Sequence, residues 1–519
     1  MRLSAESRYT VKNNSMNHLN RRNFLKTSAL AASALSFSAR SWGQVIGANS
    51  DIRVAVIGLN GRGKNHVGSL AAIRGVRVVA LCDPDTAVLE KAKRYEGIDA
   101  ASVKTYTDLR ELFASPDIDA VTIATPNHWH SLAGIWACQA GKDVYVEKPV
   151  SHNVWEGRQL AAAAKKYNRV VQAGTQIRSG EGLREAVAYV RAGNLGKIIA
   201  SRGLCYKRRD AIGKTTGTQT IPPTINYDVW SGPAPVLPSR RNSKKNGPVH
   251  YEWHWFWPYG NGDVGNQGIH QMDVARWFLG EAGLPRHSFS LGGRVGYDDD
   301  GETPNTQVIV HDYKTAPLIF EVRGLPSKPG LTVDTTGLGS AEAADAAATT
   351  MDKYHGVSIG NVVECEGGMM IVPNYWNATA HDRDGKVIKE FKGKDGHMQN
   401  FIDVVRSRGT ADLFGPIDEG HVSSALCHLG NISHQVSRSM KPGELADQTK
   451  GSSATAEATG RMAEHLAAHG IDLAKTPLTL GATLTIDGDK ERFKGEFSNA
   501  ANKFITREYR KPFVVPQLA

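Results

Sequence analysis

A glycine-rich turn between a buried strand and a helix constrains the fold of this 519-residue chain more than any other feature. Residues 51–57 form an apolar, β-branched run, as expected of a parallel strand covered on both faces. The run leads directly into Gly58-Leu-Asn-Gly-Arg-Gly63, and a helical stretch begins at Lys64. Glycines here let the backbone turn sharply and approach a pyrophosphate, which the helix N-terminus stabilises. The sequence therefore predicts a nucleotide-binding unit.

A second strand supplies the other half of this unit. Residues 76–81 form a further apolar run shortly before Asp83, and this carboxylate follows Gly63 by 20 residues, the spacing at which it would meet a ribose 2′-hydroxyl. Asn60 stands where the middle glycine of G-x-G-x-x-G is usual. Because a carboxylate repels a 2′-phosphate, Asp83 favours NAD as the cofactor. Arg62 could pair with such a phosphate, so NADP is the alternative.

The alternation of strands and helices then continues. Residues 120–125 form a strand that is followed by Pro126-Asn-His-Trp-His130, and residues 143–146 form one that is followed by Glu147-Lys148-Pro149. This pattern predicts an α/β fold with an N-terminal Rossmann domain, a doubly wound parallel sheet whose ligands bind at the carboxyl ends of the strands. The polar residues expected at that edge are Thr125, Asn127, His130, Glu147 and Lys148.

The sequence changes character after Arg178, where strand candidates are more widely spaced. These candidates are residues 198–204, 306–310, 318–322 and 369–372. The Ala-rich stretch 341–351 and the polar segment 447–459 are predicted to be surface insertions or linkers.

Residues 254–277 combine aromatic residues, glycines and the start of a helix that carries His270. Aromatic rings beside a polar loop suit a sugar, because its C–H faces stack on rings while its hydroxyls take hydrogen bonds. An aromatic corner of the core explains Trp255 and Trp257 equally well, and both interpretations stay open.

The glycine turn, the Ala-Thr-Pro-Asn-His-Trp-His run at 124–130 and Val-Glu-Lys-Pro at 146–149 resemble the Gfo/Idh/MocA family of nicotinamide-dependent sugar and polyol oxidoreductases. The resemblance implies an α+β second domain with an open, largely antiparallel sheet, a small carbohydrate substrate and a homo-oligomer. It also implies that Lys148 reaches the nicotinamide ribose and a substrate hydroxyl.

The family's D-x-G-x-H motif implies that His270 is the general base, with Asn266 in place of the usual carboxylate. Two alternatives stay open: Asp263 or Asp273 substitutes for that carboxylate, or the chain works differently from the family. With these motifs, catalytic roles fall on Lys148, His270 and Asn266, and no metal is expected. Predicted cofactor contacts are Gly58, Asn60, Gly61, Arg62, Gly63, Asp83, Thr125, Pro126, Asn127, His130, Glu147, Lys148 and Gln176. Predicted substrate contacts are Arg178, His254, Trp255, Asp263 and Tyr375.

The N-terminus resembles a twin-arginine export signal. Arg21 and Arg22 precede Phe-Leu-Lys, although Asn20 stands where Ser or Thr is usual, and the uncharged run 27–39 is too short to span a bilayer. The expected domains are a signal and linker at 1–45, the Rossmann domain at 46–173, and the α+β domain at 174–519, whose C-terminal helix and tail return to the Rossmann domain. We expect a periplasmic or otherwise exported protein that uses the twin-arginine machinery.

Charge and cysteine content fit this expectation. The net charge is +10, but residues 1–50 hold seven Lys/Arg against one Asp/Glu, and removing that +6 leaves +4. Nucleic-acid binding is therefore not indicated, and no segment predicts a transmembrane helix. Five scattered cysteines without C-x-x-C spacing suit folding in the reducing cytoplasm before export.

Three functions are compatible with these motifs. The first is an NAD-dependent sugar oxidoreductase, the second is a redox-neutral glycosidase that oxidises, eliminates, hydrates and reduces, and the third is a non-catalytic binding protein. Outside the cytoplasm no nicotinamide pool recycles a released cofactor. An exported enzyme should therefore bind NAD tightly and restore its redox state in each cycle, which favours glycosidase chemistry or hydride transfer between two sugars over simple dehydrogenation.

Overall fold

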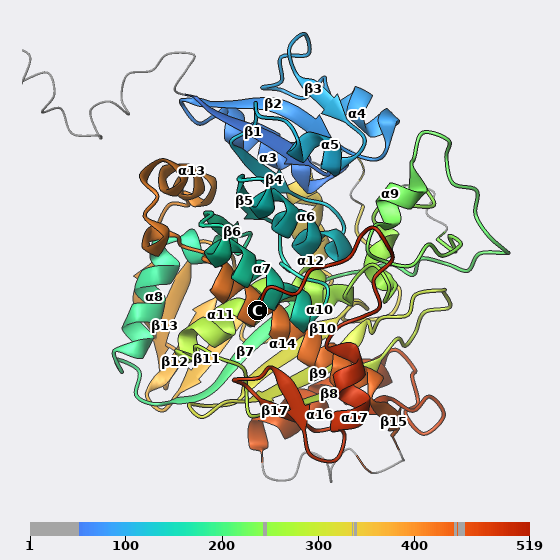
Figure 1. Ribbon diagram of the computed structural model, residues 1–519. Coiled ribbons are helices and arrows are strands. Elements are labelled where there is room, and N and C mark those ends of the chain that lie inside the picture. Colours follow the sequence, from blue (N-terminus) through green and yellow to red (C-terminus); the bar gives the residue numbers. More distant parts are fainter. Residues whose placement is uncertain (1–50, 242–246, 335, 337–339, 441–443, 445–451) are drawn as a thin grey trace, which may run out of the picture. The chain divides into compact units, whose positions relative to one another are not determined.

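Six parallel strands form the first sheet, in the order β3-β2-β1-β4-β5-β6 (Figure 1). The computed structural model describes residues 51–241, 247–334, 336, 340–440, 444 and 452–519. This strand order is that of a Rossmann fold, as the sequence predicts. The strands are β1 (Ile52–Ile57), β2 (Val76–Cys82), β3 (Lys104–Tyr106), β4 (Ala120–Ile123), β5 (Asp143–Val146) and β6 (Val171–Ala173).

Helices cover both faces of this sheet, so alternate residues of one strand enter different cores. Ala55 and Ile57 of β1 pack with α6 and α7, whereas Val54 and Val56 pack with α3 and with Phe401 of α13. The sheet is therefore doubly wound. The helices are α3 (Arg62–Ala71), α4 (Thr86–Ala92), α5 (Leu109–Phe113), α6 (Asn127–Gln139), α7 (Val154–Lys166) and α13 (His397–Ser407).

The second sheet is largely antiparallel and runs β14-β13-β12-β11-β7-β10-β9-β8-β16-β15, with β17 paired to β8 and β18. Only the β7–β10 pair among the described strand pairs of this sheet is parallel. Together the two sheets confirm the predicted fold class. The strands are β7 (Ile198–Tyr206), β8 (His287–Gly293), β9 (Thr306–Asp312), β10 (Leu318–Arg323), β11 (Ile359–Cys365), β12 (Gly368–Val372), β13 (Ala378–Asp382), β14 (Val387–Phe391), β15 (Ser437–Ser439), β16 (Thr479–Gly481), β17 (Leu484–Asp487) and β18 (Arg492–Lys494).

Helices α11 (Gly268–Leu279) and α14 (Ile417–Gln435) pack against this second sheet, and α8 (Glu181–Arg191) packs against its β11–β14 end. Helix α16 (Ser453–Ala468) also packs on it, because Ala458, Met462 and Leu466 are buried with β8, β9 and β10 residues. The prediction of a surface linker is therefore wrong from Ser453 onward, while residues 447–451 lie outside the described residues.

Shorter elements complete the chain, and its C-terminal tail runs beside the first sheet, where Phe513 packs on Trp129 with ring centroids 5.5 Å apart. No helix in the described ranges has the length and apolarity needed to span a membrane. The shorter elements are η1 (Gln176–Ser179), α9 (Tyr227–Ser231), η2 (Glu252–Trp255), α10 (Gly262–Asn266), α12 (Ser340–Ala348), η3 (Thr410–Asp412), α17 (Ser498–Ala501) and η4 (Asn502–Phe504).

Candidate functional site

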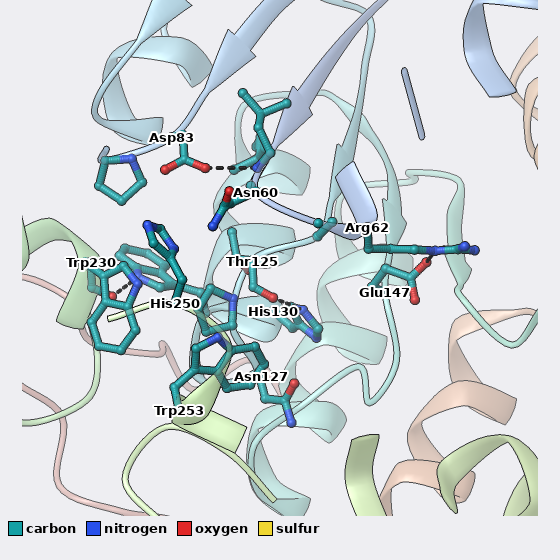
Figure 2. Close-up of a pocket in the computed structure, with 18 of the residues that line it drawn as sticks. Asn60, Arg62, Asp83, Thr125, Asn127, His130, Glu147, Trp230, His250 and Trp253 are labelled. Carbon is teal, nitrogen blue, oxygen red and sulfur yellow. Dashed lines mark hydrogen bonds and ion pairs between the residues drawn. The ribbon is translucent and has the colours of Figure 1, made fainter. Parts of the chain in front are cut away.

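A cavity of about 330 Å³ lies at the carboxyl ends of β1, β2, β4 and β5, where a doubly wound sheet binds its ligands (Figure 2). Most of the predicted cofactor residues line it: Gly58, Asn60, Gly61, Arg62, Asp83, Thr125, Pro126, Asn127, His130, Glu147 and Lys148. The predicted residues His254 and Asn266 line it as well. The sequence motifs therefore converge on one cavity.

The turn after β1 is shaped for close approach of a phosphate. Gly58 has a φ of +82°, and a Cβ there would lie 2.6 Å from the carbonyl oxygen of Ala124. A Cβ at Gly63 would lie 1.9 Å from the carbonyl oxygen of Gly58. Helix α3 has no side-chain cap at Gly61 and no acidic residue in its first turn. Its N-terminal N–H groups and positive dipole end therefore fit the pyrophosphate of a dinucleotide.

Asp83 is held in place for a ribose. Its Oδ2 accepts the N–H of Leu59 at 2.9 Å and its Oδ1 accepts the N–H of Asp85 at 3.0 Å, as Figure 2 shows for the first of these. Burial raises the pKa of Asp83 to about 6, although the two backbone N–H groups oppose this. Each carboxylate oxygen can still accept a second hydrogen bond. This arrangement fits the hydroxyls of an adenosine ribose.

Glu147 is the centre of a buried cluster beside the cavity. Its Oε1 accepts hydrogen bonds from Arg62 Nε at 2.9 Å and from Gln176 Nε2 at 3.0 Å, and His66 Nε2 lies 3.0 Å from it. Burial alone would raise the pKa of Glu147, but Arg62 and His66 outweigh it and hold this pKa well below its usual range. The Nε of Arg62 is thus engaged by Glu147. Two predicted cofactor residues, Gln176 and Gly63, are not among the residues that line the cavity. Gln176 contributes indirectly, through its hydrogen bond to Glu147.

Of the two residues predicted to act in proton transfer, Lys148 lines the cavity, whereas His270 is not among its lining residues. Lys148 Nζ donates to the backbone carbonyl of Asn266 at 2.5 Å, and burial lowers the pKa of Lys148 to about 8. His270 is 5% exposed, and its Nδ1 has no hydrogen-bond partner among the described residues. Burial, and then the charge of Lys148, keep the pKa of His270 well below its usual value. A neutral imidazole with a free ring nitrogen can accept a proton.

A hydrogen-bonded chain of Lys207, Gln267 and Tyr375 ends beside the ring of His270. Gln267 Nε2 donates to the hydroxyl oxygen of Tyr375 at 2.8 Å, and Gln267 Oε1 accepts from Lys207 Nζ at 2.7 Å. The rings of Tyr375 and His270 lie 5.0 Å apart between centroids. The Tyr375 O–H remains able to donate, for example to a substrate oxygen. Neither Lys207 nor Gln267 was predicted, because Lys207 belongs to no recognised motif and Gln267 occupies an unspecified position of the D-x-G-x-H motif.

Four of the five predicted substrate residues do not line the cavity, namely Arg178, Trp255, Asp263 and Tyr375. Arg178 forms a buried ion pair with Asp273 at 2.8 Å. Asp263 pairs with Arg209 at 2.7 Å, and the Arg209 guanidinium lies 5.3 Å from the ring of the buried Trp255. Removing one partner of such an ion pair would leave an unpaired buried charge, so the charged groups of Arg178 and Asp263 have a structural role. The structure therefore favours the core interpretation of Trp255, and neither aspartate replaces the missing carboxylate.

The segment between β7 and α10 contributes lining residues that sequence reasoning missed, namely Trp230, His250, Tyr251 and Trp253. His250 Nε2 lies 3.0 Å from Asp85 Oδ2, and the N–H of Asn226 donates to the carbonyl of Pro84 at 2.9 Å. This segment therefore contacts the chain directly after Asp83. The aromatic run could have indicated Tyr251 and Trp253, because it begins before His254. Nothing local marked His250.

Comparison with known proteins agrees with this geometry. Residues 52–175 match the NAD-binding Rossmann fold of the GFO/IDH/MocA oxidoreductase family, and residues 197–285 match the C-terminal alpha/beta domain of that oxidoreductase family. Both matches support the resemblance to the Gfo/Idh/MocA family that the motifs indicate.

Individual relatives match over part of their length. A glycosyl hydrolase family 109 protein from Shewanella pealeana is 29% identical over 203 residues, which is 35% of this chain and 44% of that protein. Glycosyl hydrolase family 109 protein 1 from Shewanella sp. strain ANA-3 is 31% identical over 153 residues, 28% of this chain and 33% of that protein. The chain thus matches less than half the length of these curated relatives.

Solved structures share the fold. The WlbA dehydrogenase from Bordetella pertussis, crystallised with NADH and UDP-GlcNAcA, has a TM-score of 0.51 at 18% identity over 73% of this chain and 95% of that one. An oxidoreductase from Thermotoga maritima has a TM-score of 0.51 at 14% identity over 73% and 97%. At this level of identity the similarity concerns the fold.

Proposed function

We propose that this chain is an NAD-dependent enzyme that moves a hydride between a ring carbinol of a sugar or glycoside and tightly bound NAD. The observation that carries the proposal is that the half-buried Lys148, which lines the cavity beside Glu147, lies close enough to the buried His270 for its charge to lower the pKa of that imidazole. The family matches at 52–175 and 197–285 support it.

The chain's own residues would carry the proton and the charge. A free nitrogen of His270 accepts the carbinol proton, and the ammonium of Lys148 stabilises the negative charge that develops on the same oxygen. Bound NAD supplies the acceptor for the hydride. Asn266 holds Lys148 in position through its backbone carbonyl. His270 is buried and Lys148 is half-buried, which limits the access of water and strengthens their electrostatic interactions.

NAD rather than NADP is the cofactor that the charges favour. Asp83 lies where a 2′-phosphate would approach, and Arg62 is held by Glu147. The contacts of His250 and Asn226 next to Asp83 support tight binding, because the segment that carries them must move before the adenosine end can leave.

A redox-neutral glycosidase is the second candidate, and the curated relatives named as glycosyl hydrolases favour it. In that reaction, transient oxidation of a ring hydroxyl acidifies the adjacent C–H, the glycoside eliminates, water adds and the hydride returns. The same His270 and Lys148 would serve both reactions. A non-catalytic binding protein is less favoured, because such a protein would not need a buried base near the proposed nucleotide cavity. A homo-oligomer remains a proposal.

Product analysis without added cofactor separates these candidates. Purified protein is incubated with p-nitrophenyl glycosides and, separately, with pairs of free sugars, and the products are identified by mass spectrometry. Release of p-nitrophenol with retained NAD supports the glycosidase, whereas one oxidised and one reduced sugar supports hydride transfer between sugars. No conversion of any sugar or glycoside would contradict the proposed function.

The affinity for NAD is expected to fall as the pH drops below about 6. The raised pKa of Asp83 means that its carboxylate takes up a proton in this range, and that proton competes with the ribose hydroxyls. At neutral pH, Asp83→Ala should weaken binding by about 1–3 kcal/mol, as for a charge-assisted hydrogen bond. Calorimetric titration of cofactor-free protein from pH 5 to 8 tests both effects. Identical NAD affinity and pH dependence in the variant would remove Asp83 from the site.

Turnover is expected to decline as the pH rises above about 8. Burial lowers the pKa of Lys148 to about 8, so its stabilising ammonium is present below this pH and lost above it. The pH profile of kcat for the wild type and for Lys148→Ala provides the measurement. If Lys148→Ala retains measurable activity and this activity declines over the same alkaline pH range, a group other than Lys148 causes the decline.

We also propose export by the twin-arginine route, which rests on Arg21 and Arg22, outside the described residues. Replacing both with Lys is expected to leave the protein in the cytoplasm, because the export receptor requires the pair. Fractionation of the native host followed by immunoblotting gives the result. Undiminished export of the double variant would contradict the proposal.

A further inference from the structure

A second cavity, of about 770 Å³, lies beyond the wall of the first. Asn127 lines the first cavity and Asn261 lines the second, and Asn127 Nδ2 donates to Asn261 Oδ1 at 3.0 Å. One side of the second cavity is a single face of α14, and another is the C-terminal tail at 506–510. Its size is that of a small-molecule site.

The α14 face presents polar atoms that lack partners. Asn431, 3% exposed, donates its amide to the carbonyl of Asn261 at 3.0 Å, but its Oδ1 accepts no hydrogen bond from the described residues. His428 is also 3% exposed; its Nε2 lies 3.0 Å from Ser151 Oγ, and its Nδ1 has no partner within the described part of the chain. A buried acceptor without a donor is costly, so Asn431 Oδ1 calls for a hydroxyl or amide donor, and His428 Nδ1 for a donor or an acceptor according to its tautomer.

The charges of the lining are already compensated. Arg507 Nε lies 3.3 Å from Glu156 Oε1, and Arg510 Nη1 lies 2.6 Å from Asp228 Oδ1. The other charged lining residue, Glu508, is exposed and negative. An anion would therefore find no unpaired arginine here, and a cation would have to compete with the arginines that already hold Glu156 and Asp228.

Aromatic and apolar groups form the rest of the walls. Trp257 and Tyr509 are half-buried, and Phe504 and Val236 are 38% and 47% exposed. Aromatic faces, the unpartnered Asn431 Oδ1 and the Glu508 carboxylate, both of them acceptors, suit a ligand with C–H faces and several hydroxyl donors. We propose that this second cavity binds an uncharged sugar, at a site separate from the nucleotide cavity. The inference stands independently of the reaction proposed above.

Calorimetric titration of the full-length, NAD-containing protein with methyl β-D-glucopyranoside and methyl β-D-galactopyranoside tests the proposal. Val236→Trp should fill the cavity from its exposed rim and reduce the affinity for the bound glycoside at least tenfold. Val387→Trp, at a 44% exposed valine of β14, is the matched control and should bind like the wild type. The NAD content should be equal in all three proteins.

Absence of binding of either glycoside to the wild type would overturn the proposal, as would equal affinity in the wild type and Val236→Trp. If Val236→Trp binds the glycoside as tightly as the wild type but has a different oligomeric mass, the proposal is overturned as well. That result would identify the cavity as a contact between copies of the chain. The titration requires no turnover. Failure of this site and failure of the proposed reaction are therefore distinguishable.

Discussion

His270→Ala is expected to lower kcat by about 10²–10⁴-fold while the protein keeps its fold and its bound NAD, because this is the usual effect of removing a general base. His270 is 5% exposed, its Nδ1 has no hydrogen-bond partner among the described residues, and its pKa is held well below the usual value by burial, so the imidazole is neutral. Lys148→Ala should also lose turnover, since it removes the charge that stabilises the developing alkoxide.

Steady-state kinetics and the NAD content of the purified variants give the result. His381→Ala is a suitable control, because this half-buried histidine on β13 bonds only Thr379 and the carbonyl of Gly385. It should retain wild-type turnover. Wild-type kcat in His270→Ala would contradict its role as the base.

Gly63→Ala is expected to abolish NAD binding and to lower the free energy of unfolding by about 1–3 kcal/mol, the range for overpacking a close contact. The added Cβ would lie 1.9 Å from the carbonyl oxygen of Gly58, so the turn or the helix must shift. In the same helix, Gly68→Ala meets no atom within 4 Å and should raise the free energy of unfolding by about 0.5–1 kcal/mol.

Urea unfolding and the NAD content of both variants test this pair. Opposite signs at two glycines only five positions apart would show that the turn, rather than the helix in general, requires glycine. Retention of NAD in Gly63→Ala would contradict the proposal that the pyrophosphate binds at the turn after β1.

Local patterns predicted β1, β2, β4 and β5 of the first sheet, because each is a mostly apolar run with a turn signal at its end, as at 51–63. The three-residue strands β3 and β6 were not predicted. In the second sheet, the predicted strands 198–204, 306–310, 318–322 and 369–372 correspond to β7, β9, β10 and β12, but their pairing was not predicted. Its β7–β10 pair joins residues more than a hundred positions apart, and no local periodicity specifies that partner. Helix α16 was missed because Ala458, Met462 and Leu466 form an apolar stripe among small and polar residues, which the sheet alone makes recognisable as a core face.

The candidate site also contains some residues that the sequence predicts and others that it does not. The residues that follow β1, β2, β4 and β5 were predicted correctly as a group at one sheet edge, because topology alone brings strand ends together. Arg178 and Asp263 were placed wrongly, because an ionisable side chain near a motif can turn to a buried partner that only the folded chain supplies. His250 was missed for the same reason, since its contact with Asp85 spans 165 positions.

The most direct test of the central claim is a single-turnover measurement of absorbance at 340 nm. Protein that is purified with its NAD is mixed in a stopped-flow instrument with each sugar or glycoside that it converts. We predict that the absorbance at 340 nm rises during the first turnover, and that it returns to its starting value if the reaction is redox-neutral. In His270→Ala the absorbance should not rise. Conversion of a substrate by the wild type with no change at 340 nm would contradict it.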